Sequence, residues 1–246
     1  MRALFFLLWM PHFLISQEVK SENNDILFLS INHTLQIPAG DMKERFGNNS
    51  DISLSLTLKT HKQITISLEC GALFGPTVKD NNLFNPIDGN NGSLISQNGE
   101  IPTIRLFERG GHVDVSIGKL IKSSTTTSNS GILLSIGTGY MYHKIFIETL
   151  TTELPQLNSD LIKGYDRLSG GILTKQFVGY LHFSEKNNFR YFIGFESIQA
   201  FTQDLRQYNY SIQEYVHNKR RDYLFGFKCG FIVPINERQK ERYYYY

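Results

Sequence analysis

Beyond its first 17 residues, this 246-residue chain lacks any apolar run long enough to cross a membrane as a helix, which needs about 20 residues. It also lacks an excess of charge of one sign. The 25 Lys and Arg residues stand against 23 Asp and Glu residues, which argues against a dedicated nucleic-acid binder. Prolines are few, seven against 20 glycines and 31 Phe or Tyr residues, and this composition suits β-structure.

Cysteine is equally scarce. The two thiols, Cys70 and Cys229, lie far apart in the sequence and do not make a disulfide framework. Both fall on the apolar side of alternating segments. We expect buried or lipid-facing free thiols, with a disulfide between the two as the alternative.

The N-terminus holds the most apolar segment of the chain. Arg2 precedes the run Ala3–Met10, and a second short run ends at Ser16. A positive residue, a short apolar stretch and a small residue at its end are the parts of a secretory signal peptide. We therefore expect residues 1–16 to be a signal peptide cleaved near Ser16–Gln17; a membrane anchor is the alternative. The absence of a following cysteine argues against a lipoprotein.

Alternation of apolar and polar residues is the main signal in the rest of the chain. It is strictest on the two sides of the polar break Thr60–Lys62, and a period of two predicts strands with one apolar face. Two such strands joined by a short polar segment form a β-hairpin. Six further segments alternate in the same way, so eight strands are expected: near 26–36, 51–59, 63–74, 112–121, 131–147, 176–184, 189–202 and 222–235.

The connections between these strands alternate in length. The long ones are 37–50, 75–111, 148–175 and 203–221, and the short ones are 60–62, 122–130 and 185–188. Long loops at one end, short turns at the other and an even strand count are typical of an antiparallel up-and-down transmembrane barrel. With no linker, repeat or charge block, residues 17–246 are expected to form one all-β barrel domain with a periplasmic tail at 236–246. Asn98-Gly99 predicts an added hairpin in the longest loop.

A membrane barrel and a soluble barrel differ in whether the apolar face of the strands points outward or inward. The polar face carries too many charges for a soluble core: Lys59, Glu69, Asp114, Arg190, Glu196, Asp222 and Lys228. The apolar face is nearly free of charge, with Lys119 near a strand end as the exception. It is therefore expected to face lipid, and a soluble sandwich or barrel with a wet face is the alternative.

The same reading assigns individual residues. Lipid-facing positions of the first hairpin are expected to be Ile52, Leu54, Leu56, Leu58, Ile64, Ile66 and Leu68. In segment 176–184, the apolar set is Phe177, Leu181 and Phe183, and the polar set is Gln176, Tyr180 and His182. Aromatic rings are expected at both membrane interfaces: one of Phe74, Tyr140, Tyr142, Tyr223 and Phe225, the other of Phe183, Phe189, Tyr191 and Phe231.

The lumen of an eight-stranded barrel is just wide enough for side chains to fill it. Glu69, Asp114, Glu196 and Lys228 fall at similar heights, so they are expected to form an ion-pair layer in which Lys228 faces Glu196 or Glu69. Structural pairing is the main interpretation, and a proton or ion path is the alternative.

Catalytic chemistry has weak support. His112, Asp114 and Ser116 share one face of a strand, as in a Ser/His/Asp hydrolase, but a polar lumen produces the same spacing. The chain has no phosphate-binding glycine loop, Cys/His metal cluster or nucleophile elbow, so no cofactor, metal or catalytic residue is expected. The basic run His217–Arg221 could contact lipopolysaccharide phosphates, or be a solvated loop.

Three stretches carry a family resemblance: GYMYHKIFIETLTTELPQL with GYDRLSGG, FIGFESIQAFTQDLR, and RDYLFGFKCGFIVPI with the final tyrosines. They are similar to small outer-membrane β-barrel proteins of Bacteroidota. The resemblance implies an outer-membrane protein that is a structural anchor or interaction partner in the cell envelope. Because some of these barrels are accessory parts of the type IX secretion and gliding apparatus, a place there is a further implication. An outer-membrane enzyme acting on lipid or lipopolysaccharide, and a narrow channel, are the alternatives.

The resemblance also implies partners. These are outer-membrane lipids and lipopolysaccharide, the barrel-assembly machinery, and periplasmic or envelope proteins. No nucleic-acid partner is expected, because the charge of the chain is nearly balanced. The end of the chain resembles the terminal aromatic signal that the barrel-insertion machinery reads. A tail that could bind a periplasmic partner consists of Arg242, Tyr243, Tyr244, Tyr245 and Tyr246.

Overall fold

The computed structural model of the protein describes residues 25–80, 82–87, 94–122, 129–150, 154–158, 160–183 and 189–235. The expected signal peptide, 1–16, and the expected tail, 236–246, lie outside these ranges. Within them, no helix combines the length and the apolar character needed to cross a membrane.

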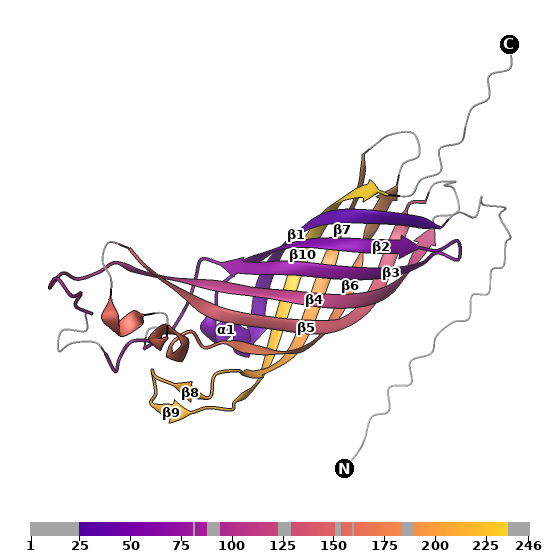
Figure 1. Cartoon of the computed structure of the whole chain (residues 1–246). Coiled ribbons are helices and arrows are strands. Elements are labelled where there is room, and N and C mark those ends of the chain that lie inside the picture. Colours follow the sequence, from indigo (N-terminus) through magenta and orange to yellow (C-terminus); the bar gives the residue numbers. More distant parts are fainter. Residues whose placement is uncertain are drawn as a thin grey trace, which may run out of the picture.

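Eight long strands form one closed antiparallel barrel (Figure 1). They are β1 (Ile26–Gly40), β2 (Asn49–Lys59), β3 (Ile64–Gly75), β4 (Ile104–Lys122), β5 (Gly131–Thr149), β6 (Ser169–Phe183), β7 (Arg190–Asp204) and β10 (Lys219–Pro234). Each pairs with the long strand that precedes or follows it, and β1 closes the ring by pairing with β10. The expected eight-stranded up-and-down topology is confirmed, and closure leaves no free sheet edge.

The two ends of the barrel differ. We call one the turn end; there the amide of Thr60 donates to the carbonyl of Ile64 over 2.8 Å in the connection from β2 to β3. The other, the loop end, carries the remaining elements: α1 (Asp41–Arg45), the 3-10 helices η1 (Pro155–Leu157) and η2 (Leu161–Gly164), and the two-stranded ribbon of β8 (Tyr208–Asn209) and β9 (Glu214–Tyr215). Figure 1 shows β4 and β5 projecting beyond the other strands at the loop end.

Several strands reach farther toward the loop end than alternation indicated. β4 begins at Ile104 rather than His112, and β6 begins at Ser169 rather than Gln176. Gly-Gly pairs in both added segments interrupt the alternating pattern, although the backbone stays paired there. At the expected Asn98-Gly99 hairpin, the amide of Gly99 donates to the carbonyl of Ser96 over 3.0 Å, but residues 94–103 contain a turn and no strand.

The outer surface of the barrel is apolar. Ile52, Leu54 and Leu68 are 50–52% exposed, whereas Lys59 and Glu69 of the same hairpin are 1% and 7% exposed and point inward. The pattern continues around the ring with the exposed residues Ile31, Leu35, Val113, Val115, Ile117, Ile136, Phe195 and Phe227. So large an apolar surface is unfavourable in water. The apolar face is therefore the lipid-facing face, and the chain is a transmembrane barrel.

The expected direction of β6 was wrong. Phe177, Leu181 and Phe183 are buried in the lumen, and Gln176 lies on the outer face with the exposed Tyr180. His182 shares that face; its ring stacks on Tyr180. The physical reason is that this part of the lumen must be filled: a Cβ added at Gly179 or Gly194 would lie 2.5 or 2.8 Å from the tip of the Phe177 ring. The ring of Phe177 occupies the space that these glycines leave.

Outward-facing aromatic residues lie near both ends of the barrel, as expected, except that Phe183 points inward. Near the loop end, Tyr140 and Tyr142 are exposed on the outer face. Near the turn end, the ring of Phe189 lies 5.8 Å from that of Phe231. Phe183 does not belong to this second ring, because it is buried in the lumen, where its ring lies 6.2 Å from that of Phe28.

Apolar clusters fill the lumen at both ends. The turn-end cluster consists of Ile26, Phe28, Leu120, Phe177, Leu181, Phe183, Phe192 and Ile232. The loop-end cluster includes Met42 of α1 and Phe46, both fully buried, together with strand residues such as Leu73, Met141, Leu173, Ile198 and Leu224. Glu69, Asp114, Glu196 and Lys228 therefore lie between two apolar clusters.

Paired substitutions on β2 test the direction of the faces. Leu56→Asp places a charge in lipid and should lower the free energy of unfolding by about 1–2 kcal/mol. Ser55→Asn keeps a neutral polar side chain in the lumen, where its neighbours are the polar Ser30 and Asn32, so its effect should be smaller. Urea unfolding in lipid vesicles, followed by heat-dependent gel mobility, measures both. A larger loss for Ser55→Asn would contradict the assignment.

Candidate functional site

A layer of ion pairs crosses the middle of the lumen. The inward register of four strands places Glu69 on β3, Asp114 on β4, Glu196 on β7 and Lys228 on β10, and all four are buried. The Lys228 ammonium lies 2.5 Å from Glu69 Oε1 and 2.6 Å from Glu196 Oε2. One cation is thus shared by two carboxylates, and the structure brings into direct contact three of the four residues that the sequence placed at this height.

Lys175 on β6 is a second cation of this layer that sequence reasoning missed. Its ammonium lies 3.1 Å from Glu69 Oε2 and also contacts Asp114. Lys175 precedes the expected start of its strand by one residue, which is why it was assigned to a loop. The sequence did contain a signal that Lys175 belongs to this strand. Lys175 is two residues from Phe177, and residues two apart in a strand lie on the same face.

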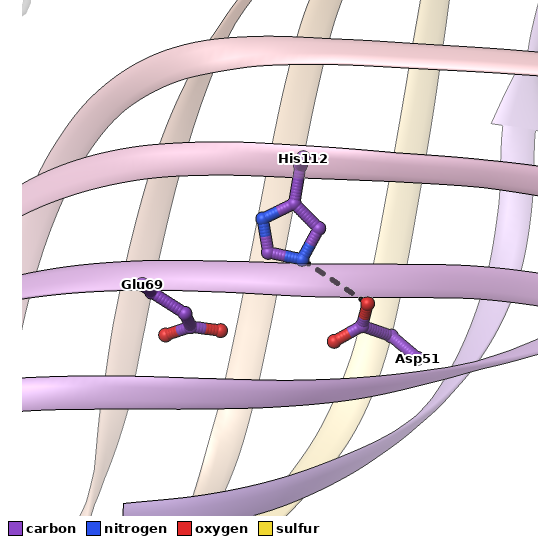
Figure 2. A group of neighbouring side chains, drawn as sticks. All are labelled: Asp51, Glu69 and His112. Atoms are coloured by element: carbon purple, nitrogen blue, oxygen red, sulfur yellow. Dashed lines mark hydrogen bonds and ion pairs between the residues drawn. The ribbon is translucent and has the colours of Figure 1, made fainter. Parts of the chain in front are cut away.

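His112 links this layer to a further carboxylate. Its Nε2 is 3.1 Å from Asp51 Oδ1 (Figure 2). Its Nδ1 is 2.9 Å from Asp114 Oδ2. Two carboxylates can both accept from one ring only if both nitrogens carry hydrogen, so this geometry suits an imidazolium. Neither nitrogen is then available as a base toward Ser116, and the geometry does not assemble a hydrolase triad.

Asp51, Glu69 and His112 lie close enough to hold a metal ion in principle, since one ligand atom from each falls within 4.8 Å of the others (Figure 2). Their existing contacts do not fit that role. Each oxygen of Glu69 already faces an ammonium, and both nitrogens of His112 face carboxylates. A metal would have to displace or repel these cations, so the group is better described as a charge network.

A second polar group lies nearer the loop end. The Nε2 atom of His143 is 2.9 Å from Asp222 Oδ2, which also accepts a 2.5 Å hydrogen bond from the hydroxyl of Thr202. The ring of Phe46 packs edge-on against His143, with centroids 5.5 Å apart. The connection between β1 and β2 therefore packs through Phe46 against this buried pair.

Arg45 links the connection between β1 and β2 to residues on the opposite side of the barrel. Its Nη1 donates to the carbonyl of Arg167 over 3.0 Å and to the hydroxyl of Ser169 over 3.1 Å, and its Nη2 is 4.0 Å from Asp204. Burial, together with the positive charge of Arg220 and Arg167, lowers the pKa of Arg45 to about 10. The side chain therefore stays charged at neutral pH and keeps these contacts.

A small cavity lies beside the ion-pair layer, toward the turn end. Its volume is about 50 Å³, and it is lined by serine and threonine hydroxyls, by aromatic residues such as Phe28 and Phe177, and by the ends of Lys175 and Lys228. This is room for a few water molecules with polar partners, but not for a larger ligand.

The basic run His217–Arg221 divides between two environments. Arg220 turns toward the mouth of the barrel, where its Nη2 donates to the carbonyl of Asp41 over 2.7 Å and lies 3.3 Å from Asp222 Oδ1. His217, Lys219 and Arg221 are exposed. The tail residues Arg242 and 243–246 lie outside the described residues.

No protein-family model matches the chain, and no curated protein matches it. Among solved structures, it is similar to Ail, the attachment invasion locus protein of Yersinia pestis, with 7% identity and a TM-score of 0.44 over 85% of this chain and 99% of that one. It is also similar to Neisserial surface protein A (7%, TM-score 0.45, 84% and 96% coverage). The outer membrane protein OprG from Pseudomonas aeruginosa is similar at 11% identity and a TM-score of 0.35, with 85% and 95% coverage. Similarities at these identities and TM-scores do not support a conclusion about function. The evidence that this chain forms a barrel is its own strand pairing.

Removing the shared cation tests the energetic role of the layer. Lys228→Met leaves Glu196 buried without its counter-charge, and breaking a buried pair in this way costs about 3–5 kcal/mol. We expect the free energy of unfolding in lipid vesicles to fall by that amount. Lys228→Met with Glu196→Gln removes a carboxylate charge too and should recover at least about 1 kcal/mol. Equal losses in the single and double variants would contradict a paired layer.

Proposed function

We propose that this chain is a non-enzymatic outer-membrane barrel that anchors a partner in the cell envelope. The observation that carries the proposal is the filled lumen: apolar clusters fill both ends, a layer of paired charges lies between them, and the exterior faces lipid. Among the described residues, side chains fill the interior, and this supports a role at the surface of the barrel rather than in its lumen. Its remaining surfaces for other molecules are its outer wall, its loop end and its tail.

The loop end is the alternative binding surface, because it exposes aromatic side chains. Ring contacts run in series from Phe84 through Tyr165, Tyr210 and Tyr208 to Tyr215, with centroids 5.1–5.7 Å apart. Tyr215, at the end of the series, is 80% exposed. Rigid aromatic side chains of this kind are favoured in protein interfaces.

The proposal also includes a partner for the tail and contacts between the barrel and lipopolysaccharide. The resemblance to barrels of Bacteroidota supports an accessory role in type IX secretion or gliding, in which residues 236–246 bind a periplasmic component. The exposed His217, Lys219 and Arg221 would contact lipopolysaccharide phosphates. The barrel-assembly machinery would insert the exported chain.

Electrical recording separates this proposal from a channel. The purified barrel in planar bilayers should show no conductance steps, because apolar side chains fill both ends of the lumen. A heat-unfolded sample serves as the control for leak caused by protein addition. Steps that appear with the folded barrel and vanish on heating would overturn the anchor interpretation.

Partner recovery tests which surface binds. Cross-linked native outer membranes, solubilised in detergent and analysed by mass spectrometry, should yield an envelope protein with the full-length chain. Replacing Tyr243, Tyr244, Tyr245 and Tyr246 by Ser should remove that protein, while Tyr215→Ala should not. Heat-dependent gel mobility confirms that both variants are assembled. Recovery that is unchanged by the tail substitutions and lost with Tyr215→Ala would place the partner at the loop end instead.

A further inference from the structure

A polar surface interrupts the apolar exterior on one wall of the barrel. Four neighbouring side chains form it: Thr174 and Gln176 of β6, and Ser197 and Gln199 of β7. They lie on the outer face, since Lys175 and Ile198 between them are buried. In the strand register, Gln176 is opposite Ser197 and Thr174 is opposite Gln199. The four residues are therefore contiguous, and we call them the polar island.

The polar island lies inside the lipid-facing belt rather than at its edge. On β6 it is bounded by Ile172 and Val178, which are 62% and 48% exposed. On β7 it is bounded by Phe195 and Phe201, which are 66% and 54% exposed. On the neighbouring strand β5, Thr138 lies opposite Thr174 and extends the polar surface.

The two glutamines are the unsatisfied part of this surface. The hydroxyl of Thr138 donates to the carbonyl of Leu173 over 3.0 Å, and that of Thr174 donates to the carbonyl of Gln199 over 3.4 Å. The carboxamides of Gln176 and Gln199 form no hydrogen bond with any residue that the structure describes. In hydrocarbon, where no water can bind them, such groups are unfavourable. A second polar surface would remove this cost.

We propose that the polar island is the interface through which two copies of this chain associate in the membrane. A carboxamide is both a donor and an acceptor, so the island is complementary to itself. Across a twofold axis, glutamines of one barrel can pair with those of the other, as in an isologous interface. The island is also uncharged, so nothing in it requires an oppositely charged partner.

The rest of the described circumference supports a closed pair rather than a larger array. β2 lies opposite β6 in the ring, and its outward residues within the belt are Ile52, Leu54, Leu56 and Leu58. On β1, His33 is a single outward polar residue between Ile31 and Leu35. One extended polar surface per barrel ends association at two copies.

Site-specific cross-linking of the full-length chain tests the proposal. In a background with Cys70→Ala and Cys229→Ala, Ser197→Cys keeps both glutamines and should give a disulfide-linked dimer on mild oxidation in the membrane. The matched control is Leu56→Cys, a lipid-facing position on the opposite wall. We expect at least about tenfold more dimer for Ser197→Cys, because contacts of this kind hold transmembrane segments together. Equal cross-linking at both positions, no dimer, or a cross-link only to another protein would overturn the proposal.

A second variant keeps the test independent of thiol chemistry. Gln176→Leu with Gln199→Leu suits a lipid face, so the barrel should assemble with unchanged heat-dependent gel mobility. Energy transfer between donor- and acceptor-labelled barrels in vesicles should show association weakened by at least about tenfold. Unchanged association would overturn the proposal. The anchor function would remain intact in that case, since conductance and partner recovery report on the lumen, loop end and tail.

Discussion

The width of a closed eight-stranded ring is the constraint on which the rest of this structure depends. Pairing of β1 with β10 gives every long strand two neighbours, so the backbone is satisfied within the lipid. The same closure leaves an interior only wide enough for side chains. Apolar clusters fill its two ends, and charge is tolerated between them because each ammonium is shared, as Lys228 is between Glu69 and Glu196.

Much of the fold could be predicted from the sequence because a period of two depends only on neighbouring side chains. It identified the number, order and direction of most strands, with Leu54 outside and Glu69 inside as examples. It failed on β6, because a row of Phe177, Leu181 and Phe183 looks the same whether it fills a lumen or faces lipid. Only the charge at Lys175 distinguishes the two, and that residue fell outside the expected strand.

The candidate site was predictable as a set of inward residues but not as a network. Which inward side chains meet depends on the shear of the barrel and on the true length of each strand. Underestimating β6 hid Lys175, and the contact of Asp51 with His112 joins residues 61 positions apart in the sequence. The inward folding of Arg45 depends on contacts with two other loop-end segments, which no local pattern encodes.

The seam between β1 and β10 also has a consequence for how the molecule is made. It joins the first and last described strands of the chain, so the ring cannot shut until nearly all of the polypeptide has arrived. Before that moment, each of these strands presents an unpaired row of amides and carbonyls, a template for aggregation. Contacts so distant in sequence form slowly. The unfinished ring therefore needs its edges shielded until it closes, and a product that ended before Lys219 would remain an open sheet with β1 and β7 as its edges.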